Sequence, residues 1–566
     1  MRGRRIAGEA AGIVLTAAVL VGYFTYPLAR HPASLGRIDS GDGQFSIWNI
    51  GWVARAIATS RDAFDANIFH PHRETLAYSE LNLGAGLLGV PAYLATGSAV
   101  AAHNWAVLIG LALSVIGMAL LVRHLTGRSD AGLTAGILYS FCPYVFAHTA
   151  HTQLLMIFGV PWVMLAFHRF VGHPSVGRAI ALGAALGVQA LFCGYYGILA
   201  GILVTYAMLF FAVARGLWRR PSWWLLGGLA AAVPVAMVLP FFLPFLRLGG
   251  DGGFRTLAEA RLYSAGWRAY LASSAWAHTW MLVYIERWRE VLFPGFVSLA
   301  LASTAVIAAF RQPNWLSGAM PNSRETVLFY AGLVLLAFWI SLGPDAGLYA
   351  LFYQIVPVFT LLRAPARFGL AVSFGLAVLS GIAAAALLAR ARPGWPIAAA
   401  IAGLAVLDLS MTMPFRTIPP PPRAYEVLAS LPPAPVVEFP FFYRPEAFHF
   451  HARYVFNSIY HWRPLINGYS DHIPEDFREM APLLASFPNP EGFIYLRERR
   501  ARYVVIHPDG YRHKARLELQ ERLEAHRQYL YPHFIDSEAW LYQIVRWPPY
   551  TADVKPLLYP RGGGER

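Results

Sequence analysis

Charged residues are scarce in this chain of 566 amino acids. They make up 14% of the sequence, whereas soluble globular proteins carry about 25%. Hydrophobic residues reach 56%, and apolar runs of roughly 18–20 residues, long enough to cross a bilayer, recur up to position 413. The composition therefore excludes a soluble protein for most of the chain, and it also excludes a disordered or collagen-like one.

Cysteine and lysine are also rare. The two cysteines, Cys142 and Cys193, lie inside apolar runs, so no disulfide framework is expected. Residues 1–413 contain 27 Arg, no Lys and 15 acidic residues, and the tail from residue 414 contains 17 Arg and 2 Lys against 17 acidic residues. The net positive charge therefore belongs to the membrane part, where Arg reports orientation rather than a nucleic-acid partner.

Eleven apolar segments are predicted to cross the membrane. If the N-terminal arginines lie in the cytoplasm, the loops on that side carry 14 Arg and three acidic residues, against 13 Arg and 11 acidic residues on the other side. This is the positive-inside distribution, and it places the tail outside the cytoplasm. The predicted spans are 10–28, 104–122, 130–147, 153–170, 178–193, 197–214, 223–246, 291–310, 326–343, 368–390 and 396–413.

Two further apolar segments are too short to cross. Residues 84–97 and 348–362 contain Pro91 and Pro357, and apolar stretches of about 10–14 residues are more often interfacial or re-entrant. We expect both on the outer face, although irregular helices within the bundle are the alternative.

The predicted fold is mainly α: a polytopic helix bundle with about 11 transmembrane helices, followed by a small extracytoplasmic α/β domain. The bundle covers 1–413 and includes outer loops at 29–103, 247–290 and 344–367; four prolines at 419–422 open the tail domain, 414–566. In the tail, short apolar runs alternate with a charged helical stretch, a pattern typical of α/β structure. These segments are Val436–Phe442, Tyr503–His507 and Trp540–Val545 as strands, and Lys514–Gln528 as the helix.

The first outer loop is unusually long and rich in ionisable residues, since compact connections run about 4–6 residues. Within it, Phe45, Trp48, Trp52 and Ala56 recur at helical spacing, which favours a helix over 43–58 lying on the membrane surface. Asp42 would stand at the N-terminus of that helix, close to the bilayer.

The stretch DSGDGQFSIWNIGWVARAI, continued by FDANIFHPHRETLAYSE, resembles the first outer loop of bacterial GT-C-type membrane glycosyltransferases. Protein O-mannosyltransferases and lipid A aminoarabinose transferases are related enzymes. The resemblance covers 1–413 in organisation and about 37–90 in residue detail. It implies that an acidic residue of this loop acts on the acceptor, and that the sugar arrives on a polyprenyl-phosphate carrier. The match falls on Asp42, with Glu80 as the second carboxylate; the adjacent acidic pair of many members is missing.

The chemistry expected of Asp42 is that of a general base. An acceptor hydroxyl that attacks an anomeric carbon needs a base within hydrogen-bond reach, and shielding at the bilayer edge raises the pKa of a carboxylate towards a useful value. The competing interpretation is that Asp42 simply caps the helix at 43–58.

The leaving phosphate needs fixed cations. Arg363 and Arg367, just before a predicted span, suit this role through the planar donor fork of arginine, and anchoring of the span is the alternative. An H-x-H pair beside Glu74 leaves a divalent cation, Mg²⁺ or Mn²⁺, open, with no metal ligand assigned. The polar segment NGYSDHIP at 467–474 is a further candidate contact for the acceptor. The weaker substrate-binding candidates are His70, His72, Arg73, His148, His151, Gln153, Arg255, Tyr263 and Trp267.

The function predicted from these features is an inverting glycosyltransferase of a bacterial inner membrane. It moves a hexosyl or pentosyl group from a lipid-phosphate carrier to a glycan, lipid or protein acceptor on the outer face. One alternative is a transporter or flippase for a lipid-linked saccharide, and another is a non-catalytic envelope assembly factor. Transporters place ionisable or broken helices near the bilayer midplane, whereas here the charges gather in surface loops, so the enzyme is favoured.

Overall fold

The computed structural model describes residues 2–247, 255–285, 290–317, 323–391 and 393–549, so parts of the 247–290 loop and the end of the tail lie outside the described residues. The chain is mostly helical, as predicted. It divides into two compact units: unit 1 comprises 1–32, 82–88 and 104–414, and unit 2 comprises 33–81, 89–103 and 415–566.

The long apolar helices identify a multi-pass membrane protein. Among the described residues, six helices are long and apolar enough to cross a bilayer. They are α1 (Arg2–Phe24), α4 (Ala99–Thr126), α10 (Gly194–Ala214), α11 (Pro221–Arg247), α15 (Ser323–Ser341) and α17 (Gly369–Leu388) with its preceding turn. Shorter apolar helices are α3 (Leu83–Thr96), α9 (Val176–Phe192), α13 (Phe296–Arg311) and α18 (Trp395–Leu409). The count of eleven crossings stays a prediction.

Proline accounts for the helix breaks in two of the apolar segments, 130–147 and 348–362. The segment 130–147 forms two helices, α5 (Ser129–Ser140) and α6 (Pro143–Ala147), because the residue before a proline avoids the helical region; Cys142 is extended, with φ −66° and ψ 152°. The segment 348–362 is divided in the same way into α16 (Leu348–Ile355) and the 3₁₀ turn η6 (Pro357–Leu361). The segment 153–170 also forms two helices, α7 (Thr152–Leu155) and α8 (Gly159–Gly172).

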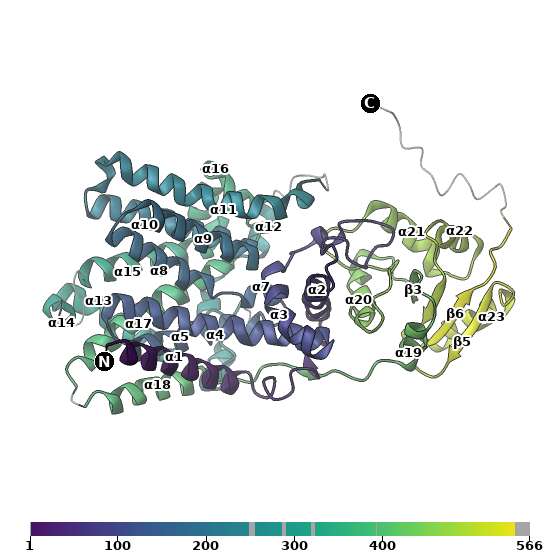
Figure 1. Cartoon of the computed structure of the whole chain (residues 1–566), viewed down its shortest axis with the longest axis horizontal. Coiled ribbons are helices and arrows are strands. Elements are labelled where there is room, and N and C mark those ends of the chain that lie inside the picture. Colours follow the sequence, from purple (N-terminus) through teal and green to yellow (C-terminus); the bar gives the residue numbers. More distant parts are fainter. Residues whose placement is uncertain (1, 248–254, 286–289, 318–322, 392, 550–566) are drawn as a thin grey trace. The chain divides into compact units, whose positions relative to one another are not determined.

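Unit 1 is built around α17. This helix is rich in Gly, Ala and Ser, and 89% of its most apolar window is buried. It packs against α5, α13 and α15, whose labels surround it in Figure 1. Small residues permit this close approach: a methyl group on Gly381 would lie 2.8 Å from a Val122 methyl carbon. The unit is therefore held together mainly by apolar helix packing.

Unit 2 contains a mixed four-stranded sheet of order β3-β4-β6-β5. Strand β3 (Val436–Phe439) runs parallel to β4 (Tyr503–Ile506), and the antiparallel strands β6 (Trp540–Ile544) and β5 (Leu530–Ile535) complete it. Around the sheet lie α19 (Arg423–Ser430), α20 (His451–Asn457), α21 (Glu475–Ala485), α22 (Pro490–Glu498) and α23 (His513–Ala525). The three predicted strands and the predicted helix of the tail are confirmed.

The first outer loop belongs to this same unit. Its short strand β1 (Leu35–Gly36) pairs antiparallel with β2 (Arg416–Thr417) from the tail, and its helix α2 (Gly41–Ala58) packs against α20. The sequence division places this loop in the membrane domain, whereas its contacts group residues 33–81 with the tail.

Candidate functional site

The start of α2 fixes the position of Asp42. Ser40 is the N-cap, and its hydroxyl accepts a hydrogen bond from the Gly43 backbone N–H at 3.1 Å. Asp42 stands in the first turn, where a carboxylate interacts favourably with the helix dipole. A methyl group on Gly43 would come within 1.9 Å of the Arg37 carbonyl oxygen, so glycine is required there. The capping role considered for Asp42 therefore falls to Ser40.

The Asp42 carboxylate accepts a hydrogen bond from a distant tyrosine of the same unit. The Tyr469 hydroxyl donates to Asp42 Oδ1 at 2.8 Å, and both residues are half-buried. Burial and the neighbouring carboxylate raise the pKa of Tyr469 well above its ordinary value, so its hydroxyl remains a donor at any physiological pH. Tyr469 belongs to the NGYSDHIP segment, which thus contacts the candidate base.

Glu80 lies in the loop that follows α2, and its backbone contacts this helix. The Asn49 side-chain amide donates to the Glu80 backbone oxygen at 3.0 Å. Asn49 follows Asp42 by seven residues, which is about two turns and roughly 10 Å along a helix axis. Asn49 therefore ties the backbone of Glu80 to α2 about two turns beyond Asp42.

Two other candidates of the first loop, His70 and His72, form hydrogen bonds with residues of the tail. His72 Nε2 lies 2.9 Å from Asp476 Oδ1, and Arg499 donates to the other oxygen of Asp476. The His70 backbone N–H donates to the Leu465 carbonyl at 2.9 Å, and burial lowers the pKa of its imidazole. Arg73 is exposed.

The contacts of His70, His72 and Glu74 do not identify a set of metal ligands. Among the described residues, no group of three or more His, Cys, Asp or Glu side chains is placed to hold a metal ion. The divalent cation stays a prediction.

The aromatic face of α2 is packed inside unit 2, so the predicted membrane-surface orientation of this face is wrong. The Trp48 indole donates to Asn67 Oδ1 at 2.9 Å, and the Trp52 indole donates to the Ala63 carbonyl at 2.8 Å. Both indole side chains are buried, as is Ala56. Helical spacing was correctly recognised, but an apolar stripe fits a protein partner as well as a lipid one.

In unit 1, the two candidate phosphate-binding arginines rest on tyrosine rings. The Arg363 guanidinium lies 5.3 Å from the centre of the Tyr263 ring, and that of Arg367 lies 4.6 Å from the Tyr195 ring. The Tyr195 hydroxyl donates to the Ala364 carbonyl at 2.5 Å, between the two arginines. Cation–π contacts of this kind orient a guanidinium, so tyrosines position both cations.

A histidine and a glutamate meet near Arg367. His148 Nε2 lies 3.7 Å from Glu290 Oε2, and His148 Nδ1 lies 2.8 Å from the Tyr144 carbonyl oxygen. Burial lowers the pKa of His148 to about 4 and raises the pKa of Glu290, while the charges of Arg367 and His151 oppose the rise at Glu290. This brings the candidates His148 and His151 into the electrostatic field of Arg367; Gln153 lies in the short helix α7.

The remaining candidates of unit 1 are Arg255, Tyr263 and Trp267 from the second outer loop. Arg255 forms an ion pair with Glu259 at 3.4 Å, and its backbone N–H donates to the Thr360 carbonyl. Tyr263 supports Arg363, as described above. Trp267 is 62% exposed and lies under the guanidinium of its neighbour Arg268.

Asp408, which the sequence places near the end of a span, is part of a buried pair. Its Oδ1 lies 2.8 Å from His278 Nε2, and its Oδ2 accepts a hydrogen bond from the Val297 backbone at 3.0 Å. The Ser273 hydroxyl lies 2.8 Å from the other ring nitrogen of His278. The carboxylate therefore ties the end of α18 to the outer loop.

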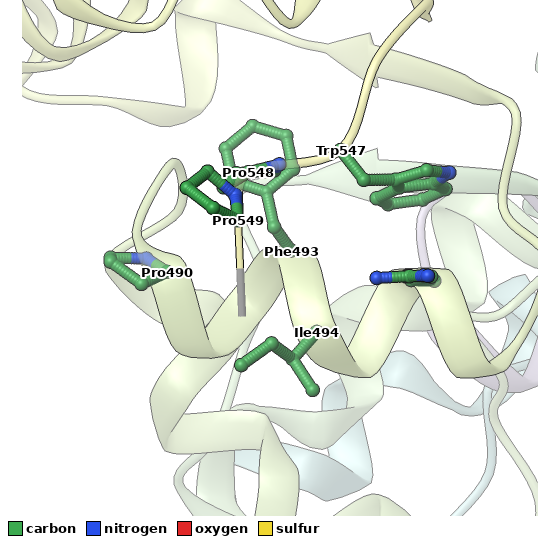
Figure 2. A pocket seen from close by; sticks show the side chains of 7 residues that line it. Pro490, Phe493, Ile494, Trp547, Pro548 and Pro549 are labelled. Atoms are coloured by element: carbon green, nitrogen blue, oxygen red, sulfur yellow. The ribbon is translucent and has the colours of Figure 1, made fainter. Parts of the chain in front are cut away.

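A small surface hollow lies on α22, and none of the predicted site residues lines it (Figure 2). Phe493 and Ile494 line it from the helix, and Trp547, Pro548 and Pro549 approach from the chain that follows β6. Its lining is almost entirely apolar, and ligand pockets usually combine such walls with convergent polar groups. We assign it no role in the reaction.

Sequence reasoning missed three residues that the structure places at the candidates: Tyr469, Tyr195 and Glu290. Tyr469 lies 427 residues from Asp42, and no local spacing links them. The NGYSDHIP segment drew attention as polar and turn-rich, which was the available signal. Glu290 sits at the edge of an apolar run, where it resembles an ordinary span boundary.

No family model and no curated protein matches the chain. Among solved structures, the chain is similar to ArnT from Cupriavidus metallidurans bound to undecaprenyl phosphate, with a TM-score of 0.42 and 14% identity over 96% of this chain and 98% of that one. The apo structure of the same protein gives a TM-score of 0.41 and 16% identity, covering 95% and 98% of the two chains. Both TM-scores lie below 0.5, so function is argued below from the chain's own residues.

Proposed function

We propose that this protein is an inverting glycosyltransferase that moves a sugar from a polyprenyl-phosphate carrier to an acceptor hydroxyl. The observation that supports it best is the Asp42 carboxylate. It stands in the first turn of α2 while Ser40 supplies the cap, and Tyr469 donates to one of its oxygens. A half-buried carboxylate relieved of capping is suited to accept a proton.

The reaction needs one displacement at the anomeric carbon. The acceptor oxygen forms a bond to that carbon on the face opposite the phosphate, and its proton passes to Asp42. The bond between the carbon and the phosphate oxygen breaks, and the electron pair leaves with the polyprenyl phosphate. A single in-line displacement of this kind inverts the configuration. Glu80, whose backbone oxygen accepts a hydrogen bond from Asn49 of α2, is the proposed second acid at the acceptor.

The departing phosphate gains negative charge, which preorganised cations stabilise. Arg363 and Arg367 are the proposed donors, because each guanidinium is oriented by a tyrosine ring within its own unit. His148 and His151 are proposed as hydrogen-bond partners of the carrier headgroup. Arg255, Tyr263 and Trp267, from the second outer loop, and His70, His72 and Arg73, from the first, are secondary candidates for contact with the substrates.

The proposed site faces away from the cytoplasm, on the outer side of a bacterial inner membrane. The Arg distribution among the loops supports this orientation. Reporters fused after residue 413 and near residue 217 test it: the first is expected to be active outside the cytoplasm and the second inside. The reverse pattern would overturn the orientation.

Asp42→Asn tests the enzyme proposal directly. Asn preserves the shape of the side chain and still accepts a hydrogen bond from Tyr469, but it cannot take up a proton. Release of polyprenyl phosphate from a panel of polyprenyl-phosphate hexoses and pentoses is expected to fall by about 10²–10⁴-fold, the usual contribution of a general base. Donor binding and thermal stability are expected to stay unchanged.

Asp62→Asn is the matched control. It changes an exposed acid of the same loop whose Oδ1 accepts the Phe64 backbone N–H, a bond that Asn keeps. Full transfer activity in Asp42→Asn would refute the role of base. Translocation of a lipid-linked saccharide without transfer, in the unaltered protein, would favour the flippase instead.

A further inference from the structure

The segment that carries Tyr469 is clamped to the central sheet by Asn467. The Asn467 side-chain oxygen accepts the Glu438 backbone N–H at 2.7 Å, and its amide donates to the Glu438 carbonyl at 2.8 Å. Asn467 is fully buried, and Glu438 lies in the middle of β3. A side chain thus takes the place of a neighbouring strand at this point, which fixes the residue two positions before Tyr469.

The first outer loop holds the same segment from the other side. The Phe69 backbone N–H donates to the Asn467 carbonyl at 3.1 Å. A methyl group on Gly468 would come within 2.5 Å of the Phe69 ring, so a glycine is needed for the two chains to lie this close. Further along, the Ser79 hydroxyl donates to Asp471 Oδ2 at 3.0 Å.

These contacts aim the Tyr469 side chain at the start of α2. Its ring meets the Phe45 ring edge-on, with the centres 5.6 Å apart, and its hydroxyl donates to Asp42 Oδ1 at 2.8 Å. The backbone is fixed on both sides and the ring is packed, so the hydroxyl reaches the carboxylate with little freedom to move.

We propose that Tyr469 is a positioning residue for Asp42, supplied by the tail to orient the general base and to keep it ionised. This inference rests on the proposed function of Asp42. A hydrogen bond to a carboxylate favours its charged form, which is the form that accepts a proton. A carboxylate accepts several hydrogen bonds at once, so the bond from Tyr469 is compatible with a second bond from the acceptor hydroxyl.

Other charged groups lie near the Tyr469–Asp42 hydrogen bond. Asp471 acts electrostatically on Tyr469, and the Arg37–Asp39 ion pair, 2.8 Å long, immediately precedes α2. The 3₁₀ turn η8 (Pro445–Phe450) places the His449 carbonyl beside Gly41. A change at the Tyr469 hydroxyl leaves all of these groups in place, so its effect can be read separately.

Tyr469→Phe in the full-length protein tests the proposal, because it removes the hydroxyl and keeps the ring. We expect kcat for transfer to fall about tenfold, the scale of a modest misplacement of a reacting group, with KM for the polyprenyl-phosphate sugar unchanged. The acid limb of the kcat–pH profile is expected to move to higher pH by on the order of one unit, because the ionised form of Asp42 loses a donor. Tyr531→Phe, which removes an exposed hydroxyl on β5, is the control and is expected to match the unaltered protein.

Two outcomes separate this inference from the proposed function. If Asp42→Asn abolishes transfer while Tyr469→Phe keeps the unaltered kcat and pH profile, the base survives and the positioning role is refuted. If Asp42→Asn is fully active, the proposed function itself fails. Should Tyr469→Phe not fold, Phe45→Leu loosens the ring and keeps the hydroxyl; a lower kcat with an upward shift of the acid limb supports the proposal, and an unchanged profile overturns it.

Discussion

The two compact units hold their candidate functional groups in different ways. In unit 1, Arg363 and Arg367 lie on tyrosine rings next to tightly packed apolar helices. In unit 2, Asp42 is oriented by a hydrogen bond from a residue 427 positions away, within a network of side-chain and backbone bonds. The orientation of the two arginines depends on how neighbouring helices pack, and that of the proposed base, Asp42, depends on correct pairing of two distant segments. Substitutions that remove a supporting side chain should therefore act through lost ring packing in unit 1 and through a lost hydrogen bond in unit 2.

Both units contain a buried histidine–carboxylate pair, which allows the sharpest comparison. His507 Nε2 lies 2.7 Å from Glu438 Oε2 in unit 2, and His278 Nε2 lies 2.8 Å from Asp408 Oδ1 in unit 1. Tyr425 also donates to Glu438, at 2.6 Å. Both pairs are buried, so the loss of either histidine leaves a carboxylate in a poorly solvated site.

The largest predicted effect is the loss of one partner of these pairs. His507→Phe and His278→Phe each leave a buried carboxylate without its imidazole and are expected to destabilise their own unit by about 3–5 kcal/mol. Denaturant unfolding in detergent, followed by limited proteolysis, reports which unit opens. If either variant opened both units, the prediction that each substitution destabilises only its own unit would be wrong. A Gln at position 507 keeps a donor and is expected to restore part of the loss.

The next effect concerns the cations of unit 1. Arg363→Gln combined with Arg367→Gln is expected to weaken use of the polyprenyl-phosphate donor by on the order of 10²-fold, the cost of removing preorganised charge at a developing anion. Arg219→Gln is the control, since Arg219 also stacks on an aromatic ring, that of Trp218 at 4.5 Å. Unchanged apparent donor affinity in the double variant would leave the pair as anchors of a span.

A smaller effect is expected at the helix cap of unit 2. Ser40→Ala removes the hydroxyl that satisfies the Gly43 N–H and is expected to cost about 1 kcal/mol of stability. Ser40→Asp keeps a capping oxygen and should restore it. Thermal unfolding measures both variants. A loss of transfer much larger than the loss of stability would mean that the cap also sets the direction of Asp42.

The smallest predicted effect is a pH dependence of unit 2. Burial raises the pKa of Asp476, but its hydrogen bonds and charge interactions with His72 and Arg499 outweigh it and hold the pKa below the ordinary value of 3.8. A depressed pKa contributes stability above pH 3.8, and that contribution is lost as the pH falls through the lower folded-state value. Because Asp476 is 42% exposed, solvent screening limits the contribution to about 1 kcal/mol or less. Comparison of stability between pH 3 and pH 6 in Asp476→Asn and the unaltered protein measures it; equal slopes would count against the linkage.

Many helices and strands could be predicted from the sequence, because the spacing of apolar residues within a short segment indicates its secondary structure. The runs at Val436–Phe442 and Tyr503–His507 became β3 and β4. Strand β5 escaped detection since Pro532 interrupts it and its side chains do not alternate between buried and exposed. The break between α5 and α6 was visible as Pro143 but was read as part of one span.

The candidate site was readable only in part. The sequence singled out Asp42, Arg363 and Arg367 by residue type and by position near predicted span ends. The motif DSGDG offers Asp39, Ser40 and Asp42 as caps, and local pattern alone cannot choose among them; the geometry selects Ser40. The pairing of Asp42 with Tyr469 depends on tertiary structure, for which a single sequence contains no local signal.

The pairing of the first outer loop with the tail has a consequence for biosynthesis. Asp42 leaves the ribosome 427 residues before Tyr469, and at about 5–20 residues per second the interval is roughly 20–85 s. During that time α2 has been made, but α20 and Asn467 have not, so its apolar stripe lacks the surfaces that later bury it. The first loop is thus made long before its partner segment, and a truncated transcript would yield the membrane helices without the Tyr469–Asp42 hydrogen bond.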